Sequence, residues 1–548
     1  MKLNINKILI IEKIALFCFF EQRDLISVKL KTNILFWTII FLLLLPVLFF
    51  PLSPDSSIYL ESGKIIANGG KLYVDTIDLK QPLIYYLFAL IYNLFGYSEI
   101  SVRLFDLIWQ FATIISLFIL VNKAKGKVTA FIASMIYAVS YTALGYSQCL
   151  QCESFAALPI LWLIYFRTYH QEKFHHLLLT GILTGLIAGF KFTLLLVFLA
   201  ITIDIIIKKP AKLNKILSVI ILFLGCIICF AITMSPIFDS MIFKGYLNVL
   251  KYLTYYSTIQ SFGVDSIKLL IKNTGAFFGD RYSLPLTISF LAGLYSFIKH
   301  LQNQDSGESS KMMNLSFLML FFLFLSVVWE GKYWDYHMTR MYIPLIILTS
   351  IGLEIVITKI REFYKSGGIY LKIIIVLLCM CAILFSPFSR WLNISRTAFF
   401  YFTNIDKYDA QFSEIISYKT VPLRKQHKLI AETINKNPGK KEMVLVISTG
   451  SNAINFFLNT DRVSAFRNSQ FIFNPVNIHD WKIRFRKELN SATWIIVQTD
   501  DSREQVIGED LSSWELFKRD SNYALYLYKN FYLFKQIGNF LIFRRYEK

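Results

Sequence analysis

Long apolar runs dominate the sequence, and they limit the chain to few architectures. A helix needs roughly 20 apolar residues to cross a bilayer, and lipid-exposed backbone must be helical because nothing else there satisfies its polar groups. We count about eleven such runs. They lie near residues 34–52, 101–121, 127–143, 154–168, 177–190, 192–207, 215–238, 284–299, 314–329, 340–358 and 370–387. The sequence therefore predicts a polytopic α-helical membrane protein, in which the short pair around Lys191 is either two helices or one broken helix.

The basic residues predict how the chain is oriented. Cytoplasmic loops of membrane proteins carry an excess of Lys and Arg, and residues 1–33 hold Lys2, Lys7, Lys13, Arg23, Lys29 and Lys31. We therefore predict a cytoplasmic N-terminal segment, residues 1–33, with an interfacial helix at 8–20 rather than a signal peptide, because no small-residue cleavage site follows. Every second loop is then cytoplasmic, and these loops are basic: Lys123, Lys125, Lys127; Arg167, Lys173; Lys208, Lys209, Lys212, Lys215; Lys299, Lys311; Lys359, Arg361, Lys365 and Lys372.

This orientation signal also accounts for the main part of the net charge of +20. In a soluble protein such an excess would point to nucleic acid, but here we expect no nucleic-acid partner. We predict a cell inner (cytoplasmic) membrane location for a membrane domain spanning residues 34–387, in which residues 53–100 form the first outer loop.

The sequence changes character after residue 387. Helical periodicity at 425–435 is followed by strand-like segments, which are the apolar runs at 443–448 and 494–497 and the alternating residues at 523–528. Helices alternating with strands predict a small α/β domain, residues 388–548. An odd number of spans places this domain outside the cytoplasm. The turn at 448–452 resembles a phosphate-cradling loop, but with one glycine a plain turn explains it better.

The first outer loop combines acids with a cation. Asp55 directly follows a span, Asp75, Asp78 and Lys80 come later, and Pro82 opens an apolar run of about 14 residues that we interpret as an interfacial helix. Any single acid here is explained by simple solvation. Their grouping with polar residues of other outer loops favours a site.

Further polar residues are predicted at the same face. Glu153 begins a span, where the helix dipole is the alternative explanation. Lys191 stands between two apolar runs and faces either a cavity or, by snorkelling, the interface. An aromatic belt explains the Trp and Tyr residues of loop 329–340, Tyr336 among them. It explains less well the charged and titratable residues of this loop, which are Lys332, His337 and Arg340. Carboxylates beside fixed cations suit sugar transfer, in which an acid takes a hydroxyl proton while cations or a metal hold a phosphate leaving group.

These residues resemble a known family. Asp55, the run Tyr73-x-Asp75-x-x-Asp78-x-Lys80-x-Pro82-Leu83, Phe95-Gly96 and Arg103 are similar to the first periplasmic loop of GT-C membrane glycosyltransferases. The likeness is to the dolichyl-phosphate-mannose protein mannosyltransferase-like and aminoarabinose-transferase-like branch. It extends to Gly189-Phe-Lys191, the Tyr336-His337 loop and the α/β tail, while Gln81 stands where many relatives have proline.

The resemblance implies a polyprenyl-phosphate sugar donor, a lipid, glycan or protein acceptor, and specific residue roles. Asp55 and Glu153 are expected to be catalytic, and a divalent metal, Mg²⁺ or Mn²⁺, is an open possibility on the same two acids. Lys80, Lys191 and Arg103 are expected to bind the donor phosphate. The remaining pocket residues are Asp75, Asp78, Tyr336, His337 and Arg340.

Two other functions compete with this hypothesis. A lipid or polysaccharide transporter or flippase would favour charges at mid-membrane and internal repeats, whereas these acids stand mostly at helix ends. An anchored binding module would not need so many spans. Cys149-x-x-Cys152 and Cys226-x-x-Cys229 have zinc-like spacing without nearby histidines, so we expect no metal there and leave a Cys149–Cys152 disulfide open.

Overall fold

The computed structural model describes most of the chain. The described residues are 34–170, 173–207, 214–259, 264–279, 283–302, 307–331, 333, 335–411, 414–416, 419–421, 423–437, 443–460, 462–476, 478–502, 504 and 508–547. The predicted N-terminal segment 1–33, its interfacial helix, and Lys208, Lys209, Lys212 and Lys332 lie outside them. The chain divides into two compact units after Leu43, and the description below concerns the second.

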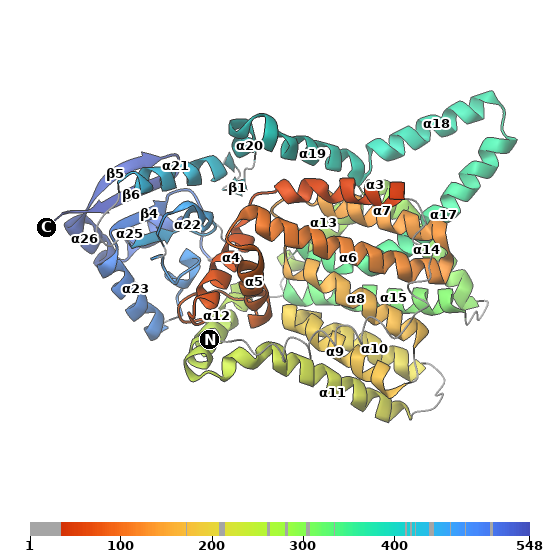
Figure 1. Ribbon diagram of the computed structural model, residues 1–548, viewed down its shortest axis with the longest axis horizontal. Helices are drawn as coiled ribbons and strands as arrows, with labels where there is room; N and C mark the ends of the chain where they lie inside the picture. Colours follow the sequence, from red (N-terminus) through yellow and green to blue (C-terminus); the bar gives the residue numbers. More distant parts are fainter. Residues whose placement is uncertain are drawn as a thin grey trace. The chain divides into compact units, whose positions relative to one another are not determined.

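The predicted apolar runs are helical (Figure 1). Five of the described helices are long and apolar enough to cross a membrane: Glu99–Lys125, Lys215–Phe238, Leu284–Gln302, Glu308–Glu330 and Tyr336–Ser366. Two bent pairs, Ile34–Phe49 with Pro54–Ala67 and Ile369–Leu384 with Pro387–Thr403, bring the number to seven if each is one span. A multi-pass membrane protein is confirmed, while the count of about eleven stays a prediction.

The bundle contains both long helices and shorter ones. Its members are α6 (Glu99–Lys125), α7 (Lys127–Ala143), α8 (Cys152–Tyr169), α9 (Phe174–Phe190), α10 (Leu196–Ile207), α11 (Lys215–Met234), α14 (Leu284–Gln302), α15 (Glu308–Glu330), α17 (Tyr342–Ser366) and α18 (Ile369–Leu384). Helix α3 (Ile34–Leu44) precedes them in the chain. The helix is interrupted at Lys191, whose backbone is extended, with φ −158° and ψ 121°. The two short runs there are therefore separate helices, α9 and α10, joined by the 3₁₀ turn η2 (Phe192–Leu195).

Glycines allow neighbouring helices to touch along their backbones. Figure 1 shows α9 and α11 side by side, and a Cβ atom added at Gly181 would lie 2.2 Å from the Leu222 carbonyl oxygen. Gly225 faces α9 equally closely, since its Cβ would lie 2.4 Å from the Leu178 oxygen. Small residues at such contacts are a general device of membrane helices, because lipid supplies no hydrophobic force between them.

Two helices form the loop between α3 and α6. Helix α4 (Pro54–Ala67) starts at Ser53, whose side chain accepts a hydrogen bond from the Ser56 N–H at 3.1 Å. Helix α5 (Pro82–Phe95) starts with Pro82, a residue suited to a first helical position. This confirms the helix expected after Pro82. Two further helices, α12 (Ser240–Ile259) and α13 (Val264–Gly279), were not predicted.

The C-terminal region contains a mixed four-stranded sheet of order β3-β4-β6-β5. Strand β3 (Val444–Ile447) runs parallel to β4 (Trp494–Gln498), and β6 (Phe540–Arg545) pairs antiparallel with both β4 and β5 (Phe531–Ile537). Ile430 and Ile434 of α21 (Leu423–Asn435) join the sheet's core. The predicted helix and two of the predicted strands are confirmed, and with them the α/β character of the region.

The strand predicted at 523–528 is wrong. These residues belong to α26 (Ser521–Asn530), whose start is capped by the Asp520 carboxylate, which accepts hydrogen bonds from the N–H groups of Asn522 and Tyr523. Its buried side chains, Tyr523 and Leu527, are four residues apart, as one face of a helix requires. The Tyr and Leu residues that alternate in the sequence therefore belong to a helix with one buried face, not to a strand.

Candidate active site

Four charged side chains meet at one end of the bundle. Lys191 Nζ lies 2.7 Å from Glu153 Oε1 and 2.6 Å from Glu330 Oε1. Arg340 Nη2 lies 2.8 Å from both Glu153 Oε1 and Glu330 Oε2. We call Glu153, Lys191, Glu330 and Arg340 the charge cluster. Two carboxylates and two cations balance, and this is what allows four charges to be buried together.

Local sequence explains why these groups converge. Glu153 is the second residue of α8, where a carboxylate complements the helix dipole. Glu330 is the last residue of α15, which Gly331 ends in the left-handed conformation, with φ 67°. Lys191 occupies the break after α9, and Arg340 lies in the 3₁₀ turn η4 (Thr339–Met341).

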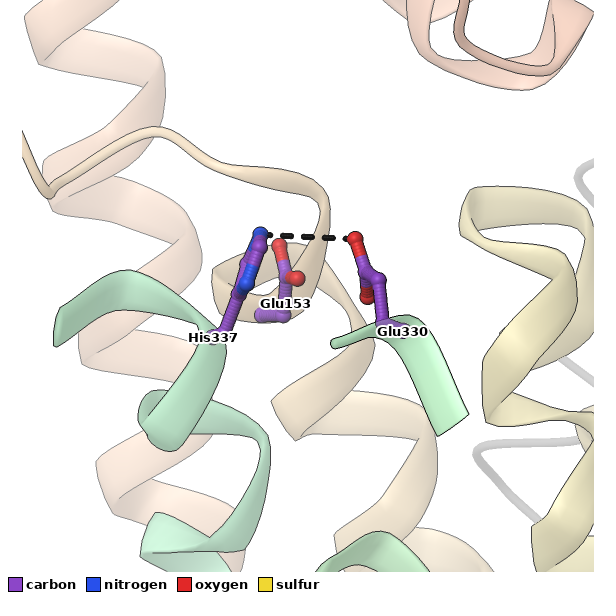
Figure 2. A group of neighbouring side chains, drawn as sticks. All are labelled: Glu153, Glu330 and His337. Carbon is purple, nitrogen blue, oxygen red and sulfur yellow. Dashed lines mark ion pairs between the residues drawn. The ribbon is translucent and has the colours of Figure 1, made fainter. Parts of the chain in front are cut away.

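His337, in the short helix α16 (Asp335–Met338), borders the charge cluster. Its Nε2 lies 3.4 Å from Glu330 Oε1, and Figure 2 shows Glu153, Glu330 and His337 pointing toward one another from three different elements. The expected residues Glu153, Lys191, His337 and Arg340 therefore lie together, and Glu330 joins them without having been predicted.

Glu153, Glu330 and His337 form the one group of potential metal ligands within the described ranges. Asp55 is not part of it. The two carboxylates already contact Lys191 and Arg340, so a divalent ion would leave the site with a net charge of about +2. Mg²⁺ and Mn²⁺ also prefer oxygen-rich sets to a histidine. Glu153, Glu330 and His337 therefore do not fit Mg²⁺ or Mn²⁺ as a set, and the ion considered for Asp55 and Glu153 stays a prediction.

Asp55 belongs to a second polar group, in the loop that follows α3. It stands half-buried in the first turn of α4, and within the described part of the chain nothing donates a hydrogen bond to its carboxylate or pairs with it. Asp55, Asp78 and Tyr336 lie within electrostatic range of the Lys80 amine. Tyr336 is also within electrostatic range of Glu153 and Glu330, so it is near both this group and the charge cluster.

Hydrogen bonds fix the backbone beside Lys80. The Tyr73 hydroxyl donates to the Lys80 carbonyl at 2.7 Å, and the Lys80 N–H donates to the Tyr85 hydroxyl at 3.1 Å. Tyr85 in turn donates to Asp78 at 2.6 Å. Burial raises the pKa of Asp78, while Lys80 and Tyr85 partly offset that effect. Burial opposes the charge of Lys80, but Tyr336, Asp55 and Asp78 raise its pKa well above the usual range, so the amine stays protonated.

Two expected site residues lie elsewhere. Asp75 accepts a hydrogen bond from the Lys71 N–H at 2.9 Å and lies 3.7 Å from Arg484 Nη2 of the C-terminal domain. Arg103 is fully buried: its Nε donates to the Phe50 carbonyl at 3.2 Å and its Nη2 to the carbonyl groups of Pro51 and Tyr146. Arg103 thus satisfies carbonyl groups where the chain leaves a helix, and we no longer count it as a phosphate ligand.

The cysteines do not form the disulfide left open by the sequence. Cys149 and Cys152 are both buried and both free, and Cys226 and Cys229 are free as well. None of the four belongs to a metal-ligand group among the described residues.

Comparison with known proteins identifies the fold. The crystal structure of ArnT from Cupriavidus metallidurans bound to undecaprenyl phosphate superposes with a TM-score of 0.53, at 12% identity, over 93% of this chain and 97% of ArnT. Residues 80–238 match the family model for dolichyl-phosphate-mannose-protein mannosyltransferase. The chain has a GT-C fold. The matched segment of this GT-C chain holds Lys80, Glu153 and Lys191, and the predicted resemblance to the ArnT-like and mannosyltransferase-like branch is confirmed.

A second solved structure is more distant. The archaeal oligosaccharyltransferase AglB from Archaeoglobus fulgidus, in complex with an inhibitory peptide and a dolichol-phosphate, has a TM-score of 0.46 at 13% identity, over 85% of this chain and 69% of AglB. No curated protein sequence matches the chain.

Proposed function

We propose that this GT-C chain is an integral-membrane glycosyltransferase that moves a sugar from a polyprenyl-phosphate donor to a lipid, glycan or protein acceptor. The observation that carries the proposal is the half-buried Asp55 carboxylate, without an ion-pair partner among the described residues, within electrostatic range of the Lys80 amine. The family match over residues 80–238 supports the same activity, and the ArnT relative was crystallised with undecaprenyl phosphate.

In the proposed reaction, Asp55 acts on the acceptor hydroxyl and Lys80 acts on the phosphate leaving group. Asp55 accepts the proton of an acceptor hydroxyl, whose oxygen attacks the anomeric carbon of the sugar. The bond between that carbon and the phosphate oxygen breaks, and the bonding electrons leave with the polyprenyl phosphate. Lys80 holds the phosphate as its negative charge grows. The pair therefore supplies the base and the leaving-group cation that sugar transfer requires.

The charge cluster has a supporting part in this proposal. Lys191 is held by two carboxylates, so we assign it to fixing Glu153 and Glu330 rather than to the phosphate. The Tyr336 N–H donates to Gln148 Oε1 at 3.0 Å, and the Lys191 amine lies 5.8 Å from the centre of the Tyr336 ring. We assign Tyr336 to the wall of the donor pocket, between the cluster and Asp55.

We also propose an orientation. The N-terminus lies in the cytoplasm, the chain crosses the inner membrane, and the domain formed by residues 388–548 lies on the outer side with Asp55 and Lys80. The basic loops predicted to be cytoplasmic support this, because they follow the positive-inside rule.

An Asp55→Asn variant tests the proposed activity. Losing a general base lowers transfer by about 10²–10⁴-fold, measured in membranes supplied with a panel of labelled undecaprenyl-phosphate sugars. Asp75→Asn is the matched control, since it makes the same change in the same loop at a residue that contacts backbone and Arg484. Full transfer by Asp55→Asn, with the wild type active, would overturn the assignment.

A further inference from the structure

Arg467 of the C-terminal domain is completely buried against two segments of the first outer loop. Its Nη1 lies 2.5 Å from Glu61 Oε2, and its Nε donates to Thr76 Oγ1 at 3.0 Å. The Asn455 amide, from the same domain, donates to Glu61 at 3.3 Å. Glu61 itself is 5% exposed. A buried, charge-assisted contact of this kind holds geometry firmly, because neither charge has water as an alternative partner.

The two segments that Arg467 joins are those that carry the proposed chemistry. Glu61 lies six residues beyond Asp55 on α4, which is about 9 Å along the helix axis. Thr76 precedes Asp78 and Lys80 in the loop. The Ser62 and Thr76 hydroxyl groups share a hydrogen bond of 2.6 Å, which completes a link from helix to loop. One guanidinium therefore touches both the helix of Asp55 and the loop of Lys80.

Backbone contacts from the same domain reinforce the loop. The Ile77 N–H donates to the Ala465 carbonyl at 2.8 Å, and Ile77 forms an isolated parallel β-bridge with Phe466. These contacts come from the residues directly before Arg467. Backbone and side chain of one short segment thus hold the stretch just before Asp78.

The other end of α4 is held in a similar way. Arg424 Nη2 of α21 lies 2.7 Å from Glu99 Oε2, and Glu99 Oε1 accepts a hydrogen bond from the Leu52 N–H at 3.0 Å. Leu52 precedes Ser53, the capping residue of α4. The C-terminal domain therefore contacts α4 itself through Glu61, and it contacts the residues around the start of α4 through Glu99.

We propose that Arg467 is a positioning residue for sugar transfer, setting the Asp55 helix against the Lys80 loop, so that the C-terminal domain is part of the active unit. The inference rests on the proposed function. If Arg467 is lost, Glu61 keeps a buried charge without its guanidinium partner, and the Ser62–Thr76 hydrogen bond is left as the polar link described above between the helix and the loop. Asp55 and Lys80 are then held less firmly in the positions that one substrate requires.

Hydrogen exchange on the full-length protein in detergent tests the positioning directly. We expect Arg467→Gln to speed exchange at least tenfold in residues 54–67 and 71–80, with the rest of the bundle unchanged. Arg467→Lys retains most of the protection. Thr76→Val frees residues 71–80 but leaves 54–67 protected, because the Glu61 pair remains. Arg519→Gln is the control, since Arg519 pairs with Glu509 on the exposed surface of the same domain.

Binding of undecaprenyl phosphate, followed by fluorescence, is the second measurement. We expect Arg467→Gln to weaken it at least tenfold, and Arg519→Gln to leave it unchanged. Unchanged exchange in both Arg467→Gln and Thr76→Val overturns the inference. If Arg467→Gln does not fold, Thr76→Val decides by its effect on residues 71–80. If the wild type does not bind the lipid, the proposed function fails, while the exchange pattern still decides the positioning.

Discussion

The charge cluster is a balanced set of four, and this determines how single substitutions act. Lys191→Met leaves Glu153 and Glu330 with one cation between them, and breaking a buried pair in this way destabilises a protein by about 3–5 kcal/mol. Adding Glu330→Gln restores neutrality, so we expect the double variant to regain at least about 1 kcal/mol of that loss. Denaturant unfolding in detergent measures both effects.

Lys244→Met is the matched control for this prediction. Lys244 pairs with Asp480 at 2.9 Å but is 70% exposed, and such surface pairs contribute about 0–1 kcal/mol. Strictly additive effects of Lys191→Met and Glu330→Gln would show that the four charges do not act as a unit.

The sequence predicted most of the charge cluster but not all of it. Glu153, Lys191 and Arg340 stood out because charges next to apolar runs are costly unless they face a partner. Glu330 has the same feature, because it is an acid at the end of an apolar run and Gly331 follows it. It was nevertheless not predicted as a site residue, because it stands among aromatic residues. Arg103 is a different case, since the family-like spacing could not reveal that its Nε and Nη2 donate to backbone carbonyls.

At the scale of elements, glycines decide which helices touch. Gly181→Leu places a side chain where even a Cβ atom would lie 2.2 Å from the Leu222 oxygen of α11. Overpacking of this kind costs about 1–3 kcal/mol or more, so we expect a lower thermal midpoint in detergent. Gly275→Leu is the control, because nothing lies within 4 Å of a Cβ added there. Equal midpoints for the two variants would contradict the close packing of α9 on α11.

Helices were predictable wherever apolar length alone decides the conformation. The bilayer leaves such runs no alternative, so α6, α11 and α15 followed directly from the sequence. At residues 523–528 the sequence pattern fitted both the period of a helix and that of a strand. The helix is favoured by the Asp520 cap and by the hairpin that residues 531–545 form. The local pattern at 523–528 reveals neither of these two features.

At the scale of the whole molecule, orientation is the prediction that matters most. In a background in which cysteines are replaced by serine, we expect Asp510→Cys to react with an impermeant maleimide in intact spheroplasts. Lys127→Cys should react only after lysis, because it lies in a loop predicted to be cytoplasmic. Both positions are exposed. Labelling of both cysteines from outside, or the reverse pattern, would reject the orientation derived from the basic loops.

The contact between Arg467 and Glu61 also sets an order of events during synthesis of the chain. The two residues are 406 positions apart, and a ribosome adding about 5–20 residues per second needs about 20–80 s to travel between them. Glu61 is therefore made long before its guanidinium partner exists. A nascent or truncated chain that ends before residue 467 lacks the side chain that contacts both the Asp55 helix and the Lys80 loop. The site is therefore complete only after residue 467 has been made.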